Sequence, residues 1–562
     1  MNRSHLLLSA LLATGCAASE PADLVLKNGV VYTVDDQNPK AEAVAIRGSE
    51  IIFVGSNAEA AKFEGSKTRV VDLAGATVLP GLADAHYHLS GVGEREMVLN
   101  LEGTGTKEAF LAKVAERVGV AKPGEWVTGR GWIETFWVPQ AFPSRHDLDR
   151  IAPNNPVALV RADGHALVAN TKALALAGIT PATAAPPAGA LNKDVKGELT
   201  GMLIDGAMGL LYRVVPPPTS ADEDSAYVIG ARLSVELGWT QVHDAGVSWG
   251  DVARIRRLYG QGAIKLRTYQ AIRGPGSDAD SLLANGASVD EFGGRYTVRT
   301  LKAAVDGALG SRGALLIEPY SDDAKVHGLL TTDTAAFRTM LVSALEKGIQ
   351  VETHAIGDGG NRLMLDMYAA AFKSVPNGER RRVHQPRWRN EHAQIVDPAD
   401  IPRFKELGVI PSMQPSHAIG DLYFAEARLG AKRLIGAYAW KSFLDLGLPV
   451  AGGSDAPVER GEPMIEFYAA VARRDIRGNA GADSVWHPEQ KVSREEALKM
   501  FTKYAAFASF EEDKRGSITK GKWADLTILD RDIMTVPEVD ILTTKTVMTI
   551  IAGEVVYAKP GN

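Results

Sequence analysis

Residues 78–89, VLPGLADAHYHL, constrain the fold more than any other stretch of the chain. An apolar run enters the stretch, a Pro-Gly pair interrupts it, and His86, Tyr87 and His88 close it. Residues two apart in an extended strand point to the same side, so His86 and His88 project together while Tyr87 faces away. Two neutral imidazoles at a strand end can hold one divalent transition metal. Two ordinary polar histidines at a strand exit are the alternative, and only the rest of the chain separates these interpretations.

Residues 76–512 alternate apolar strand-like runs with amphipathic helical stretches. That order favours βα units with parallel strands, hence an α/β fold. Eight candidate strand ends fit a (β/α)8 TIM barrel, whose active site lies at the carboxyl-terminal face. These ends are His88, Asp244, Ile272, Lys302, His354, His392, Gln414 and Asp455. About 150 residues separate the first two ends, so we expect a large insertion at about 90–235 that caps the barrel mouth.

Both ends of the chain are rich in short strand-like runs. Residues 22–75 contain the turn signals Asn28-Gly29 and Arg47-Gly48 between β-rich runs, and residues 513–562 return to the same pattern. We therefore expect one small β-sandwich domain built from both termini.

Residues 1–16 follow the plan of a signal peptide, with a basic start at Arg3, a short apolar core and small residues before Cys16. The core is too short to span a bilayer. The ending resembles a bacterial lipobox, in which the cysteine is lipidated, although Ala13 stands where a larger aliphatic residue is usual. The leader predicts an exported protein, either an outer-membrane-anchored lipoprotein facing the periplasm or a free periplasmic one. Membrane contact is expected only through the N-terminal lipid anchor.

Composition narrows the class of partner. Apolar residues make up 45% of the 562 and charged residues 23%, which is typical of a soluble globular protein. The net charge is −6 and no basic block resembles a nucleic-acid footprint. We expect a small-molecule amide substrate and no nucleic acid, with a homodimer as one open alternative. Cys16 is the one cysteine and lies in the leader, so the chain offers no plausible cysteine nucleophile.

Four later strand ends complete a set with the two histidines: Lys302, His354, His392 and Asp455. Each alone has an ordinary interpretation, as a hydrogen-bonded polar residue or as a helix cap. In this order the set resembles the amidohydrolase superfamily, and residues 516–526 resemble its C-terminal signature. The chain is most similar to the branch of YtcJ-like and N-substituted formamide deformylase enzymes, amidohydrolase family 3. That similarity rests on Gly131-Trp132, on residues 163–166 with Asn170, and on residues 302–307, 353–358 and 453–455.

The resemblance implies one or two divalent metal ions per chain, and Zn²⁺ is the expected ion. It assigns His86, His88 and Asp455 to the more buried ion and His354 and His392 to the second ion. Lys302 would bridge both ions as a carboxylated lysine. A buried ammonium beside two cations is strongly disfavoured, so Lys302 should be neutral or modified. In the mononuclear alternative Lys302 instead pairs with an acid such as Asp306.

The chemistry follows from the metal. Zinc lowers the pKa of bound water towards about 7, and it also polarises a carbonyl. Asp455 would orient the resulting hydroxide, accept its proton and pass it to the leaving nitrogen. We expect hydrolysis of a non-peptide C–N bond in an amide, formamide or cyclic amide. An esterase or lactonase using the same site, and a catalytically inactive binding lipoprotein, are the alternatives.

Substrate contacts are predicted from two regions. Trp132 and His165 in the insertion, beside Trp137, could line an apolar pocket with a polar handle; a place in the core of the insertion is the alternative. Arg312 could bind a carboxylate, and His417 follows the seventh strand. His243-Asp244 at the second strand end would support the metal ligands. The substrate-binding candidates are thus Trp132, His165, Arg312 and His417.

Overall fold

The computed structural model describes residues 20–134, 137–162, 164, 166–186, 189–378, 380–476 and 485–560. The predicted leader with Cys16, and His165 of the insertion, lie outside the described residues.

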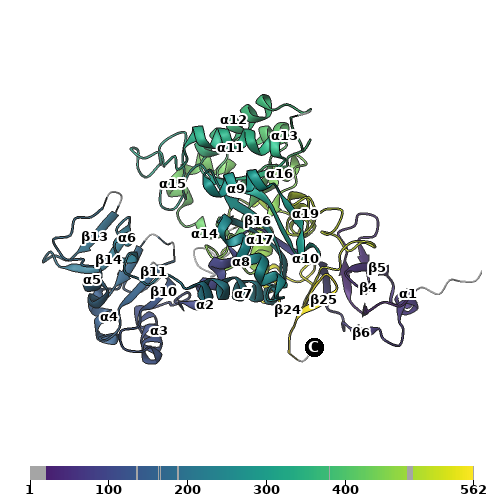
Figure 1. Cartoon of the computed structure of the whole chain (residues 1–562), viewed down its shortest axis with the longest axis horizontal. Coiled ribbons are helices and arrows are strands. Elements are labelled where there is room, and N and C mark those ends of the chain that lie inside the picture. Colours follow the sequence, from purple (N-terminus) through teal and green to yellow (C-terminus); the bar gives the residue numbers. More distant parts are fainter. Residues whose placement is uncertain are drawn as a thin grey trace, which may run out of the picture.

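Eight parallel strands form a central barrel sheet (Figure 1). They are β8 (Leu82–Tyr87), β15 (Trp239–Val247), β16 (Arg267–Arg273), β18 (Tyr296–Ala304), β19 (Gln350–Ala355), β20 (Arg389–His392), β21 (Ile410–Met413) and β22 (Ala451–Gly452). They pair in chain order from β8 to β22, and short β17 (Ser288–Asp290) adds an antiparallel edge to β18. Beyond the last strand, Asp455 N donates to His86 O at 2.7 Å, which joins the end of β22 to β8. The predicted barrel is confirmed.

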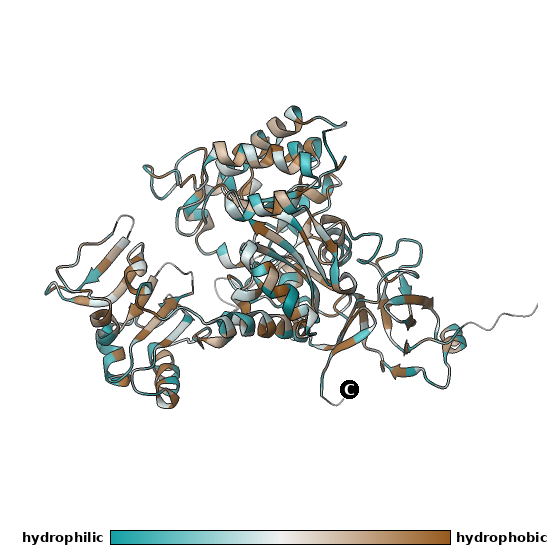
Figure 2. Ribbon diagram, viewed as in Figure 1, coloured by the Kyte–Doolittle hydropathy of each residue, from teal (hydrophilic) through white to brown (hydrophobic). Residues whose placement is uncertain are grey.

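Helices cover the outside of the barrel, and their ends carry the expected caps. They include α7 (Ser220–Leu237), α8 (Trp249–Gly260), α9 (Ser277–Asn285), α11 (Thr334–Lys347), α12 (Asp358–Ser374), α13 (Ile401–Leu407), α16 (Trp440–Asp445) and α17 (Pro463–Ala472). Helix α7 opens with a capping box between Thr219 and Asp222 and ends at Gly238 with φ 105°. The brown, apolar faces of these helices and of the strands meet in Figure 2, where they bury one large core.

Strands from both termini form the predicted sandwich, at the right of Figure 1. One sheet has the order β5-β4-β1-β6, with β1 (Leu24–Lys27), β4 (Ala43–Arg47), β5 (Glu50–Gly55) and β6 (Arg69–Asp72). The other has the order β25-β24-β23-β7-β2-β3, with β2 (Val30–Tyr32), β3 (Lys40–Ala41), β7 (Thr77–Pro80), β23 (Leu526–Leu529), β24 (Thr546–Ile551) and β25 (Glu554–Ala558). Leu26 and Val44 from one end share a buried core with Leu526 and Ile550 from the other. Burial of this shared core ties the two ends together.

The insertion after β8 forms a separate lobe, at the left of Figure 1, which we call the cap. Its mixed sheet has the order β13-β14-β12-β11-β10-β9, with β9 (Leu99–Asn100), β10 (Val127–Trp132), β11 (Val157–Arg161), β12 (Ala166–Ala169), β13 (Gly189–Lys193) and β14 (Leu199–Asp205). Helices α3 (Lys107–Val120), α4 (Arg145–Ile151), α5 (Thr171–Leu176) and α6 (Met208–Tyr212) pack on this sheet. The sheet buries aromatic and aliphatic side chains on both of its faces.

Helix α2 (Leu89–Met97) leads from the barrel into the cap and packs on α7, which returns. Glycine allows this close approach: a Cβ on Gly93 would lie 1.8 Å from Ala226 O, and one on Gly230 would lie 2.3 Å from Leu89 O. Because α2 starts directly after His88, this tight contact also holds the end of β8. Within the described ranges, no helix combines the length and the apolar character needed to cross a membrane.

Candidate metal centre

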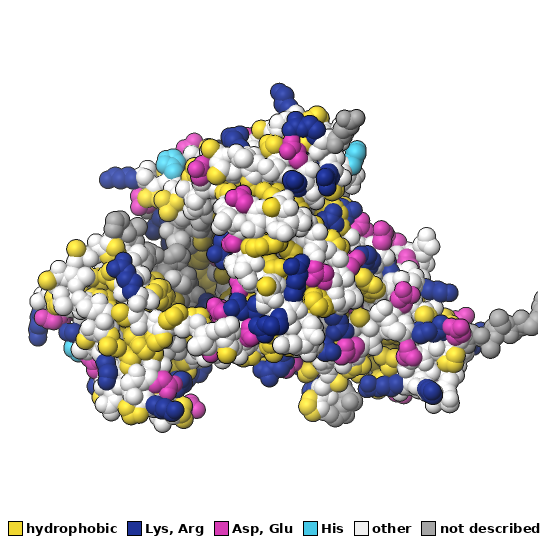
Figure 3. Space-filling model, in the orientation of Figure 1, with side chains coloured by type: hydrophobic (Ala, Val, Ile, Leu, Met, Phe, Trp, Pro, Cys, Tyr) yellow, Lys and Arg dark blue, Asp and Glu magenta, His cyan; other side chains and the backbone are white. Residues whose placement is uncertain are grey.

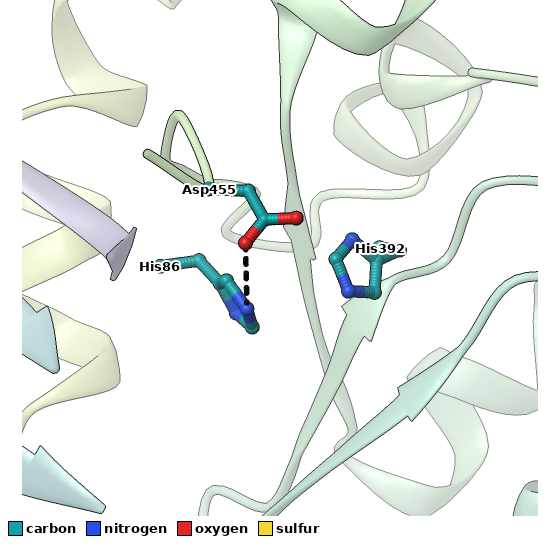
Figure 4. Close-up of side chains that lie close together, drawn as sticks. All are labelled: His86, His392 and Asp455. Carbon is teal, nitrogen blue, oxygen red and sulfur yellow. Dashed lines mark ion pairs between the residues drawn. The ribbon is translucent and has the colours of Figure 1, made fainter. Parts of the chain in front are cut away.

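The carboxyl-terminal ends of the barrel strands bring the predicted ligands to one place. His86 is the last residue but one of β8, His392 ends β20, and Asp455 follows β22. One ligand atom from each of these three buried residues lies within 4.8 Å of the other two. Figure 4 shows the three side chains turned toward one another, with the His86–Asp455 ion pair dashed. This spacing suits three ligands of one transition-metal ion.

His88 and Lys302 complete the inner face of this cluster. Nε2 of His88 lies 3.0 Å from Oδ1 of Asp455, and Nε2 of His86 lies 3.6 Å from the same oxygen. Nζ of Lys302, on β18, is 3.2 Å from Nε2 of His86. His86, His88, Lys302 and Asp455 are therefore neighbours, as the resemblance implies for a bridged metal centre.

His354 on β19 lies on the other side of His392. The two imidazole centroids are 4.5 Å apart, and those of His392 and His86 are 4.9 Å apart. Nε2 of His354 is buried without a hydrogen-bond partner and lies 3.5 Å from Oδ1 of Asp306. A buried nitrogen without a partner is costly, and coordination of a metal would satisfy it. The donor set thus fits a divalent metal, with His354 beside the first three ligands.

Protonation states also fit metal binding. Burial lowers the pKa of His86 to about 4 and that of His354 to about 3, so both rings are neutral at pH 7. Burial alone would raise the pKa of Asp455, but the hydrogen bond from His88 and the nearby His86 hold it well below its usual range. Neutral imidazoles and an ionised carboxylate are the forms that coordinate metals.

Lys302 is partly buried, and burial lowers the pKa of its amine, which favours the neutral form that reacts with carbon dioxide. The mononuclear alternative pairs Lys302 with an acid such as Asp306, and the structure does not show that particular pair. Instead the Asp306 carboxylate accepts hydrogen bonds from the backbone N–H groups of Ile356, Gly357 and Leu315 at 2.8–3.0 Å. Asp306 thereby holds the loop that follows His354.

Backbone strain is concentrated at two ligands. His392 has φ 77° and Asp455 has φ 62°, in the left-handed region that residues other than glycine avoid. Such strain persists only where the surrounding structure imposes it, and it is common at functional sites. Here it turns both side chains inward at the ends of β20 and β22.

Comparison with known proteins identifies the family. Residues 69–557 match the amidohydrolase family. The chain belongs to this family. It is 34% identical over 522 residues to Protein LONG AFTER FAR-RED 3 of Arabidopsis thaliana, a match that covers 90% of this chain and 87% of that one.

Two other relatives carry the names implied by the predicted branch. Putative amidohydrolase YtcJ of Bacillus subtilis is 32% identical, with 94% of this chain and 98% of the relative covered. N-substituted formamide deformylase of Arthrobacter pascens is 29% identical, with 96% and 99% covered. The crystal structure of an uncharacterized metal-dependent hydrolase from Pyrococcus horikoshii superposes with a TM-score of 0.74 at 26% identity, covering 92% of this chain and 99% of that one. The predicted resemblance is confirmed, and these findings support a metal-dependent hydrolase.

The predicted metal ligands of this amidohydrolase are held by buried polar partners that sequence reasoning missed. Glu391 contacts Nδ1 of His86 through a short hydrogen bond, and Gln414 Oε1 lies 2.8 Å from Nδ1 of His392. Asp84 Oδ1 accepts from the N–H groups of His86 and Ser454 at 3.0 and 2.9 Å. For Asp84 the available signal was the period-two alternation of β8, which places it on the same side as His86. Glu391 directly precedes His392, so the alternation of β20 gave no such signal for it.

Of the predicted supporting pair, Asp244 accepts a hydrogen bond from Leu89 N at 2.9 Å and so holds the residue that follows His88. His243 is also buried, with Nδ1 2.8 Å from Nη1 of Arg389.

The predicted substrate residues fall in different surroundings. His417 lies at the mouth, with Nε2 3.6 Å from Oδ2 of Asp455 and its ring stacked near His392. Trp132 is fully buried in the cap core, and its Nε1 donates to Leu159 O at 2.9 Å, so the core alternative holds for this residue. Trp137 is buried beside it, with Nε1 donating to Thr104 O. Both indole N–H groups are thus used within the cap.

Arg312 was predicted to bind a substrate carboxylate. Its guanidinium instead makes a two-point ion pair with Asp322 at 3.1 and 2.9 Å in the loop after β18, so an internal carboxylate already occupies its donors.

A Gly-x-Ser-x-Gly stretch at residues 246–250 has the spacing of a hydrolase nucleophile elbow, and it joins β15 to α8. Ser248 is the N-cap of α8: its hydroxyl donates to Asp251 at 2.6 Å and accepts from the Asp251 N–H at 3.2 Å. Its contacts are those of a capping residue.

A cleft of about 530 Å³ lies between the cap and the rim of the barrel. Glu102 and Ile133 line it from the cap, while Ser416, Ile419 and Val458 line it from the loops after β21 and β22. The face in Figure 3 is hollowed between the two lobes, with basic and acidic side chains interspersed around it. Ser416, in the lining of this cleft, directly precedes His417 in the chain.

Proposed function

We propose that this amidohydrolase cleaves the C–N bond of a non-peptide amide, formamide or cyclic amide. The observation that best supports this proposal is the buried cluster of His86, His392 and Asp455, with His88, His354 and Lys302 beside it. The name of the deformylase relative supports a formamide or a similar small amide as substrate.

The residues have separate roles in this proposal. One or two divalent ions, taken as Zn²⁺, would be held by the four histidines, Asp455 and a carboxylated Lys302. Such a centre lowers the pKa of bound water towards about 7 and polarises the scissile carbonyl. Asp455 accepts the proton of the attacking water and delivers it to the leaving nitrogen, because an amine anion is too poor a leaving group. His417, 3.6 Å from Oδ2 of Asp455, would contact the substrate beside that oxygen.

The test is a substrate screen with metal-loaded protein. N-substituted formamides and cyclic amides are compared with the esters and lactones of the same shape. Faster turnover of the nitrogen series supports the proposal. Turnover confined to the oxygen series would replace it with an esterase or lactonase, and tight binding without turnover would favour the binding lipoprotein.

We further propose that the leader places the enzyme outside the cytoplasm, anchored at Cys16 to the outer membrane. Wild type expressed in a Gram-negative host should fractionate with membranes, and Cys16→Ser should impair lipidation. Release of unacylated wild type in the soluble fraction, without detergent, would exclude the anchor.

A further inference from the structure

Inside the barrel, on the same strand as His392, lies a fully buried arginine, Arg389. The guanidinium reaches Ala85 O on β8 through a short contact, and His243 Nδ1 on β15 at 2.8 Å. It also reaches Ser412 Oγ on β21 at 3.0 Å, and Glu352 Oε2 on β19 lies 3.5 Å away. One side chain thus joins five of the eight barrel strands, counting its own. A buried arginine is tolerated when its donors and its charge are satisfied in this way.

The principal partner of Arg389 is Glu391, two residues along the same strand. Nε of Arg389 donates to Oε1 at 2.8 Å and Nη2 donates to Oε2 at 3.1 Å, a two-point ion pair with both side chains fully buried. Two parallel N–H bonds fix the plane and the position of the carboxylate. Glu391 therefore has little freedom to move.

Glu391 passes this constraint to a predicted metal ligand. Its Oε2 accepts a short hydrogen bond from Nδ1 of His86, although the two residues are 305 positions apart in the chain. When Nδ1–H donates this hydrogen bond to the carboxylate, the lone pair of His86 remains on Nε2, the nitrogen that faces Lys302 and Asp455. The contact sets both the tautomer and the orientation of the ring.

His392 has a different kind of partner. Its Nδ1 lies 2.8 Å from the neutral amide oxygen of Gln414. A carboxylate makes an imidazole a stronger donor to a metal than an amide does, because its charge stabilises the ring as electron density moves to the ion. The two histidines therefore differ in the charge of the group that is hydrogen-bonded to Nδ1.

We propose that Arg389 and Glu391 form a positioning pair that fixes His86 as the Nδ1–H tautomer and sets the affinity of the tighter metal ion, taken as the more buried ion that His86 would hold. Neither residue touches the ion or the substrate; both act through His86. The inference rests on the metal centre of the proposed function.

The experiment measures metal affinity and does not depend on substrate. Zn²⁺ is titrated into metal-free wild type and Glu391→Gln in competition with a chromogenic chelator. The substitution keeps the shape of the side chain and gives His86 the kind of partner that His392 has. We expect an affinity for the tighter ion about 10–100-fold lower, together with altered visible absorption bands in the Co²⁺-loaded protein.

Glu511→Gln is the matched control. Glu511 is also buried and neighbours an arginine, Arg515, at 3.6 Å, but it accepts hydrogen bonds from Gln241 and Ser509 rather than from a predicted ligand. Its metal affinity and Co²⁺ bands should match wild type. If Glu391→Gln does not fold by circular dichroism, Glu391→Asp takes its place, because it keeps the charge for Arg389 but shortens the reach to His86.

The outcomes separate the two proposals. A folded Glu391 variant with wild-type affinity and unchanged Co²⁺ bands would overturn the positioning pair while leaving the metal centre intact. Equal losses in Glu391→Gln and Glu511→Gln would also overturn it, by showing a general effect of a lost buried charge. A wild-type protein that binds no divalent metal would instead overturn the proposed function.

Discussion

The barrel and the cap both enclose a core, but they fill it with different chemistry. The barrel interior holds a charged network around Arg389, Glu391 and Glu352 directly beside the predicted metal ligands. The cap packs Phe110, Trp132 and other aromatic side chains against one another. Buried ionic groups contribute little net stability compared with apolar packing. The difference indicates that the barrel interior serves the site and the cap core serves folding, and the predictions below test this division.

The largest effect is expected at Asp455. Asn at this position keeps the shape and one coordinating oxygen but cannot accept a proton. Asp455→Asn should fold, keep most of its metal and lose about two to four orders of magnitude in kcat. KM should change much less, because the proton transfer belongs to the transition state. Steady-state kinetics and elemental analysis on one preparation check this. Near-normal turnover by a metal-replete variant would move the general base elsewhere, with His417 the first candidate.

The variant Lys302→Ala tests whether the barrel site holds a second metal ion. Wild type loaded with metal in the presence of bicarbonate should hold two divalent ions per chain, and Lys302→Ala should lose at least one. The reason is that a carboxylated Lys302 would be the bridge between the two ions. Elemental analysis and intact mass provide the measurement. One ion in wild type at saturating metal, with Lys302 unmodified, would establish the mononuclear alternative.

Trp132→Ala tests the cap, where we expect a loss of stability without a loss of metal. Removing this fully buried indole should destabilise the cap by about 3–5 kcal/mol, since an aromatic core side chain and its hydrogen bond are both lost. Trp132→Ala should nevertheless bind as much metal as wild type. Urea unfolding followed by tryptophan fluorescence, with elemental analysis of the folded variant, checks both points. Loss of metal from the folded variant would contradict the separation of cap and barrel.

The pH dependence of metal binding sharpens the comparison within the site. Protons compete at His86 only near pH 4 and at His354 only near pH 3. His88 is different: burial opposes its charged form, but the hydrogen bond to Asp455 raises its pKa above the ordinary value. Affinity should therefore fall as the pH is lowered from 7 to 5, with a slope of about one proton per ion. A slope of three across this range would show that the buried histidines titrate near 6.5 after all.

The smallest effect is expected at Arg312. Its ion pair with Asp322 is partly exposed, and such pairs contribute about 0–1 kcal/mol. Arg312→Ala should leave metal content unchanged and alter kcat/KM less than about two-fold, which corresponds to well under 1 kcal/mol. A selective rise in KM for carboxylate-bearing substrates would restore the role first predicted for this residue.

Local patterns predicted the ligands at the mouth because the fold repeats one simple rule. Each of His86, Lys302, His354 and His392 lies at or near the carboxyl end of a predicted strand, and parallel strand ends of one barrel converge. The same reasoning could not separate Trp132 from a pocket residue. A tryptophan in an amphipathic insertion has the same local pattern whether its face meets a substrate or other core side chains.

The amino-acid sequence by itself determined the barrel, the cap, the shared terminal sandwich and the order of the predicted ligands, because alternation, turn residues and strand-end positions are local properties of the chain. Only the tertiary structure decided which groups form hydrogen bonds with those ligands and hold them in position. Glu391 meets His86 across 305 residues, and Arg389 contacts four other strands. Such contacts depend on closure of the barrel and on the inward register of each strand, and no local pattern encodes the distance between two strands that are far apart in the chain.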